Sequence, residues 1–102
     1  MRILILALLF SVFSYGQDIT TVHFNYKWNQ NNTYKGLDKL RNSKVQYAFV
    51  EDQSDAIKKS IKSVPTIMIY KDSRPVAKFE AGLTMEITIR LDSIQAVINK
   101  HK

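Results

Sequence analysis

The sequence of 102 residues contains no cysteine, and it has only two histidines, two prolines and three glycines. The lack of cysteine excludes disulfides, thiolate nucleophiles, zinc–thiolate sites and iron–sulfur clusters. His23 and His101 are far apart in the sequence, so no run of residues predicts a metal site, and no cofactor is expected. Neither a Ser-His-Asp arrangement nor a pair of catalytic carboxylates can be assembled from the remaining residues.

The composition is otherwise that of an ordinary soluble domain, with 45% hydrophobic and 24% charged residues. It excludes a disordered tail, a collagenous chain and a low-complexity segment, and the length allows one domain. The net charge of +6 is spread along the chain, which argues for solubility. The basic run at residues 58–62 is either the solvated face of a short helix or a surface for a polyanion. No aromatic residues are interleaved with it, so we expect no nucleic-acid partner.

Residues 1–16 have the layout of a secretory signal peptide. Arg2 precedes an apolar stretch, and the small residues Ser14 and Gly16 suit a cleavage site. The apolar stretch is shorter than the roughly 20 residues that a membrane-spanning helix needs. We therefore predict a signal peptide at residues 1–16 and one domain at residues 17–102. The mature protein would be secreted or periplasmic, and tethered to a membrane only if the signal peptide is retained.

Runs of β-branched and aromatic residues predict four strands in the mature chain. The predicted strands span residues 19–26, 44–50, 66–70 and 76–81. The third is almost continuously apolar, as expected of a central strand. The turn residues between the third and fourth strands predict a hairpin. Tyr47 and Phe49 fall on a predicted buried face, so they are expected in the core.

Three helices are predicted between and after these strands. Tyr34, Leu37 and Leu40 recur at three-residue spacing and predict the first helix, with Tyr34 in the core. Ser54 is suited to cap a short second helix, and Thr84 is suited to cap the last one. The order β-α-β-α-β-β-α predicts a four-stranded mixed sheet covered by helices on both faces, a three-layer α/β/α fold.

This order, together with three local motifs, resembles the thioredoxin-like superfamily. Residues 63–66, Ser-Val-Pro-Thr, look like the cis-proline segment that opens the third strand of that fold. Residues 71–82 are similar to the hairpin that follows it. Residues 22–28 end at Trp28, where the family has its first strand and active-site tryptophan. The resemblance covers nearly the whole mature chain.

The sequence departs from the family at the redox motif. Asn29-Gln30-Asn31-Asn32 stands where the family has Cys-x-x-Cys, so Asn29 and Asn32 occupy the cysteine positions. Dithiol exchange needs an attacking thiolate and a resolving thiol, and asparagine supplies neither. His23 stands where the family usually has a buried acid. The resemblance therefore implies a member without dithiol redox activity.

The resemblance also implies a surface for an extended peptide of a partner protein. In the family, the residue before the cis proline pairs its main chain with such a peptide. Carried over, Val64 offers its N–H and C=O groups, Trp28 an apolar wall, and Gly82 a close approach. The full predicted groove comprises Trp28, Asn29, Asn32, Val64, Pro65, Thr66, Ala81 and Gly82. The alternative is that fold geometry alone explains Pro65, and that Trp28 packs against its neighbours.

Three functions follow from these expectations. The first is a binding or scaffold module that uses the groove. The second is a structural or assembly subunit with a vestigial groove, since a domain this small without disulfides could need a partner for stability. The third is a non-dithiol enzyme on the same fold, which the amides at the active-site loop disfavour. The oligomeric state is left open.

Overall fold

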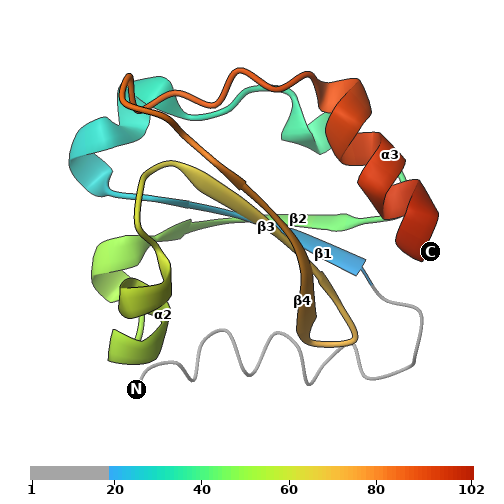
Figure 1. The fold of residues 1–102 in the computed structure, drawn as a ribbon, viewed down its shortest axis with the longest axis horizontal. Coiled ribbons are helices and arrows are strands. Elements are labelled where there is room, and N and C mark those ends of the chain that lie inside the picture. The colour runs from blue at the N-terminus through green and yellow to red at the C-terminus, as the bar shows by residue number, and fades with distance from the viewer. Residues whose placement is uncertain (1–18) are drawn as a thin grey trace.

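A four-stranded sheet with helices on both faces forms the framework of the protein (Figure 1). The structure, a computed structural model, describes residues 19–102, so the predicted signal peptide lies outside the described residues. The strands are β1 (Ile19–Asn25), β2 (Lys44–Phe49), β3 (Thr66–Lys71) and β4 (Arg74–Glu80). The α-helices are α2 (Asp55–Ser60) and α3 (Leu91–His101), and the 3₁₀ helices are η1 (Lys27–Asn32), η2 (Leu37–Lys39) and η3 (Val50–Asp52).

The strand order is β2-β1-β3-β4, which confirms the mixed sheet. β1 runs parallel to β2 and antiparallel to β3, and β3 runs antiparallel to β4. The hairpin between β3 and β4 turns at Asp72 and Ser73, which have φ of 51° and 73° as a two-residue hairpin loop requires. β2 and β4 are the edges of the sheet. Pro75 is tolerated in β4 because an edge strand does not need every N–H for the ladder.

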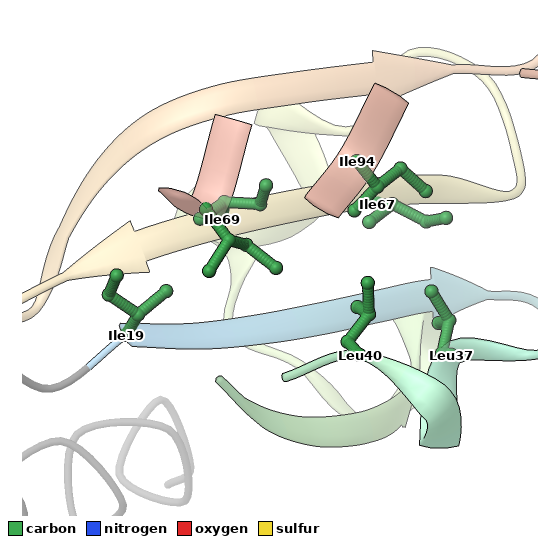
Figure 2. Packing of buried hydrophobic residues seen from close by; sticks show 7 residues of the cluster. Ile19, Leu37, Leu40, Ile67, Ile69 and Ile94 are labelled. Carbon is green, nitrogen blue, oxygen red and sulfur yellow. The ribbon is translucent and has the colours of Figure 1, made fainter. Parts of the chain in front are cut away.

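The two faces of the sheet carry separate hydrophobic clusters, because successive side chains of a strand point to opposite faces. The cluster beside α2 contains Val22, Phe24, Val50, Ile61, Val64 and Met68. The cluster beside α3 contains Ile19, Leu37, Leu40, Ile67, Ile69, Ile94 and Ile98 (Figure 2). These two clusters confirm the predicted three-layer α/β/α arrangement.

The predicted helix across residues 34–40 is wrong. Only η2 forms there, and it follows Gly36, whose φ of 96° is left-handed and cannot belong to a right-handed helix. A spacing of three residues fits the 3.0-residue turn of a 3₁₀ helix better than the 3.6-residue turn of an α-helix. Leu37 and Leu40 are nevertheless buried, as the apolar pattern requires.

The last helix begins at Leu91 rather than near Thr84. Thr84 lies instead in a tight turn in which the N–H of Met85 donates to the carbonyl of Gly82 at 3.0 Å, and Met85 has a φ of 61°. Ile87 follows without helical hydrogen bonds and packs against the cluster beside α3. The predicted stripe survives within α3, where Ile94 and Ile98 are fully buried and Val97 packs beside them.

Two further predictions are tested by the local structure. The Ser54 side chain accepts a hydrogen bond from the Ile57 N–H at 3.3 Å, which confirms Ser54 as the N-cap of α2. The core position expected for Tyr47 is wrong, because β2 is an edge strand and Tyr47 is 56% exposed. Among the helices of residues 19–102, none combines the length and apolar character needed to cross a membrane.

Candidate functional site

Three segments meet at one end of the sheet (Figure 1). The chain leaves β1 toward η1, enters β3 from α2, and leaves β4 at this same end, because β3 is antiparallel to both of its neighbours. Their side chains line a groove of about 310 Å³. Of the eight predicted site residues, Trp28, Val64 and Gly82 line this groove.

Trp28 forms one wall of the groove. It is 64% exposed, and its ring stacks on Tyr26 with centroids 5.8 Å apart and planes 13° apart. Tyr26 in turn packs against the cluster beside α2. The indole is therefore supported from behind, while much of its surface faces solvent.

Val64 also lines the groove, and its peptide bond to Pro65 is cis. Its side chain is buried in the cluster beside α2, which fixes the position of its main chain. No hydrogen bond within residues 19–102 uses the N–H or the C=O of Val64. Within the described part of the chain, both main-chain polar groups of Val64 are thus unpaired at the edge of the groove.

Pro65, Thr66 and Ala81 do not line the groove, although each is next in sequence to a lining residue or to Pro65. All three are buried. The Ala81 N–H donates to the Pro65 carbonyl at 3.1 Å, and the Thr66 hydroxyl donates to the Ser63 carbonyl at 2.6 Å. These bonds hold the loop before β3 against the end of β4, so the three residues shape the wall that Val64 presents.

Asn29, at the first cysteine position of the family motif, belongs to a buried network of amides. It is 5% exposed, and its Nδ2 donates to Asn25 Oδ1 at 3.0 Å and to the Met85 carbonyl at 3.4 Å. Its Oδ1 accepts from Asn32 Nδ2 at 2.9 Å, and its carbonyl accepts from Asn25 Nδ2 at 3.0 Å. Asn29 and Asn32 thus use their amides internally, and they tie η1 to the loop after β4.

Leu83 and Met85 line the groove and were missed by the sequence analysis. Leu83 is fully exposed and Met85 is 41% exposed. With Trp28 they make three of the four exposed large hydrophobic residues found within residues 19–102, Tyr47 being the fourth. The feature of the sequence that could have revealed them is a pair of apolar residues within three positions after Gly82, where the last helix was expected to begin.

His23 lies beside this region on the α3 face of the sheet and is 2% exposed. Its Nε2 accepts a hydrogen bond from the Tyr34 N–H at 3.0 Å. Burial lowers the pKa of His23 to about 4, so the ring is neutral at pH 7. It holds the chain after η1 in place. No three His, Asp or Glu side chains in the described part of the chain gather into a metal site.

Comparison with solved structures identifies the architecture. The thioredoxin of Schistosoma mansoni matches with a TM-score of 0.66 and 15% identity, over 94% of this chain and 88% of that one. A thioredoxin variant from Halobacterium salinarum matches with a TM-score of 0.65 and 20% identity, over 91% and 81%. The Fasciola hepatica thioredoxin matches with a TM-score of 0.63 and 18% identity, over the whole of both chains.

The fold is thioredoxin-like. At these identities the similarity establishes the architecture alone, and no protein-family model or curated protein matches the sequence. This thioredoxin-like chain contains no cysteine, so it has no thiol for dithiol exchange. The groove lined by Trp28 and Val64 lies at the end of the sheet where β1 and β4 end and β3 begins.

Proposed function

We propose that this thioredoxin-like protein binds an extended segment of a partner protein in the groove, and that it performs no dithiol chemistry. Export completes the proposal and is supported by the pattern of residues 1–16. The observation that carries the proposal is the gathering of exposed apolar side chains. Trp28, Leu83 and Met85 line one groove, although more than 50 residues of sequence separate Trp28 from the other two.

Exposed apolar side chains that gather in one place mark interaction sites, whereas single exposed residues are ordinary. Leu83 stands at the tip of a tight turn, where burial in the domain core cannot explain its identity. Trp28 is held flat by stacking on Tyr26, so its ring needs little further ordering on binding. Rigid aromatic anchors of this kind contribute strongly to interfaces.

The free main chain of Val64 favours an extended occupant. A peptide lying beside Val64 could pair with its N–H and C=O, as in strand addition. The peptide side chains on one side would then contact Trp28 and the turn at Leu83. Main-chain pairing provides affinity without requiring one sequence, and the apolar walls select the side chains.

The first test is the loss of peptide binding on truncation of Leu83. Peptides are selected from a random phage-displayed library against the protein, and the Kd of a synthetic selected peptide is measured by calorimetry. Leu83→Ala is expected to weaken binding about tenfold, because a buried leucine contact is worth roughly 1.5–3 kcal/mol. The free energy of unfolding should change by less than about 0.5 kcal/mol, since Leu83 is fully exposed.

Two further variants make this test specific. Gly82→Val places a side chain in the groove, and a Cβ at Gly82 meets nothing within 4 Å in the protein itself, so the fold should tolerate it. It is expected to weaken binding by at least about tenfold. Tyr47→Ala is the matched control, because Tyr47 is exposed but does not line the groove. Equal affinity for all four proteins would overturn the proposal.

The absence of redox chemistry has its own test. In an insulin-reduction assay with dithiothreitol, the protein should leave the rate of insulin precipitation at the level of a no-protein control, because it has no thiolate to attack a disulfide. A thioredoxin with its cysteines serves as the positive control. Any acceleration by this protein above the blank would contradict the proposal.

A further inference from the structure

One wall of the groove carries an unpaired positive charge. Lys62 lines the groove and is exposed. Lys58 and Lys59, also exposed, lie in the last turn of α2 immediately before this wall, and the Ile61 N–H donates to the Lys58 carbonyl at 3.3 Å. None of the three lysines forms an ion pair within residues 19–102.

The carboxylates of this region do not balance these lysines. No Asp or Glu lines the groove. Glu80, at the end of β4, has its Oε2 3.5 Å from the Nζ of Lys78, whose Nζ also donates to the Ser60 carbonyl at 3.5 Å. Asp52 is 3.9 Å from the Nζ of Lys27. Asp55, three and four residues before Lys58 and Lys59 in α2, forms no ion pair within residues 19–102, and this one carboxylate stands against three lysines. The α2 side of the groove therefore keeps a net positive charge.

From this arrangement we infer that the occupant of the groove is an acidic extended segment, with one apolar residue in the groove and Asp or Glu residues alongside Lys62, Lys58 and Lys59. The inference rests on the proposed function and specifies its ligand class. Complementary charge at the rim of an interface accelerates association and disfavours partners of the wrong sign. The apolar walls need an apolar anchor, which a bare polyanion lacks.

The basic run could instead serve a nucleic acid. The groove argues for a peptide, because its lining has two aromatic residues, Trp28 and Tyr26, and they stack on each other. One face of Tyr26 is therefore covered by the Trp28 ring. Single-strand binding instead uses successive bases stacked along a basic channel. An oligonucleotide is therefore included in the test as a competitor.

The experiment uses the synthetic selected peptide and a second version in which every Asp and Glu is replaced by Asn and Gln. We expect the acidic version to bind about tenfold more tightly at 50 mM salt, with the difference shrinking at 500 mM salt. Lys62→Gln should weaken binding of the acidic version about threefold, and the triple variant Lys58→Gln, Lys59→Gln, Lys62→Gln about tenfold. The neutral version of the peptide should bind the wild type and both lysine variants with equal affinity.

Lys100→Gln is the matched control, because it removes one positive charge from α3, on the other face of the sheet. Its affinity for the acidic peptide should equal that of the wild type. If selected peptides bind, lose affinity in Leu83→Ala and yet ignore the lysine changes, the inference is overturned while the proposed function stands. If no peptide is selected, the proposal that the groove binds a peptide fails. It fails equally if a 20-nucleotide single strand displaces the acidic peptide and binds the Leu83→Ala variant as tightly as the wild type.

Discussion

Replacement of Asn29 by aspartate is expected to lower the free energy of unfolding by about 3 kcal/mol at pH 7, a large fraction of the stability of a small domain. The Asn29 amide donates to Asn25 Oδ1 and to the Met85 carbonyl, and the variant has only acceptor atoms at pH 7. It therefore faces two oxygens with a buried charge. Asn25 cannot simply turn its amide, because its Oδ1 also accepts from the Tyr26 N–H and its Nδ2 donates to the Asn29 carbonyl. Urea unfolding monitored by Trp28 fluorescence measures the change.

Gln30→Glu is the matched control, since it makes the same amide-to-carboxyl change at an exposed position of η1. It should alter the free energy of unfolding by less than about 0.5 kcal/mol. Burial should raise the pKa of the carboxyl in Asn29→Asp above its usual value. The difference in the free energy of unfolding between wild type and Asn29→Asp should then be smallest at a pH below the usual pKa of aspartate, and it should grow as pH rises. If Asn29→Asp lost no more free energy of unfolding than Gln30→Glu at any pH, the amide network would not stabilise the fold.

The second large effect is a loss of stability in mild acid that depends on His23. Its pKa is about 4 in the folded protein and near the ordinary 6.5 in the unfolded chain. The unfolded state therefore binds more protons between these values, so the stabilisation is complete above about pH 6.5 and declines as pH falls toward 4. A shift of this size corresponds to roughly 3 kcal/mol. Protonation would also remove the Nε2 acceptor from the Tyr34 N–H.

The measurement is the difference in the free energy of unfolding between pH 7 and pH 4.5, compared among three proteins. His23→Gln has no titrating ring, so this difference should shrink by about 2 kcal/mol, whatever its stability at pH 7. His101→Gln removes the chain's other histidine and should retain the wild-type difference. The same pH response in His23→Gln as in wild type would show that another group controls the acid sensitivity.

The sheet could be predicted from the sequence because its signals are local and periodic. β3 is apolar through most of its length and lies between β1 and β4, and the turn residues after it predicted the hairpin. The helices were harder to place. Gly36 and Met85 take left-handed backbone conformations that end or delay the helices, and an apolar spacing of three residues does not reveal this.

The site could be predicted only in part. Trp28, Val64 and Gly82 follow from the resemblance of their motifs, and the structure brings them together. Leu83 and Met85 could not be found by periodicity, because an exposed apolar residue in a turn belongs to no repeating pattern. The buried role of Asn29 depends on the Met85 carbonyl, 56 residues away, and such a contact leaves no trace in local sequence.

The amide network beside the groove has a consequence for how the groove can be regulated. A dithiol at this place would interconvert between two covalent states according to the surrounding thiol–disulfide potential. Amide hydrogen bonds between Asn25, Asn29 and Asn32 have no such couple. The contacts between η1 and the loop bearing Leu83 therefore do not depend on thiol–disulfide exchange, in reducing and oxidising compartments alike. A partner bound there would be retained or released according to its own concentration and affinity, and not by the formation or reduction of a disulfide at this place.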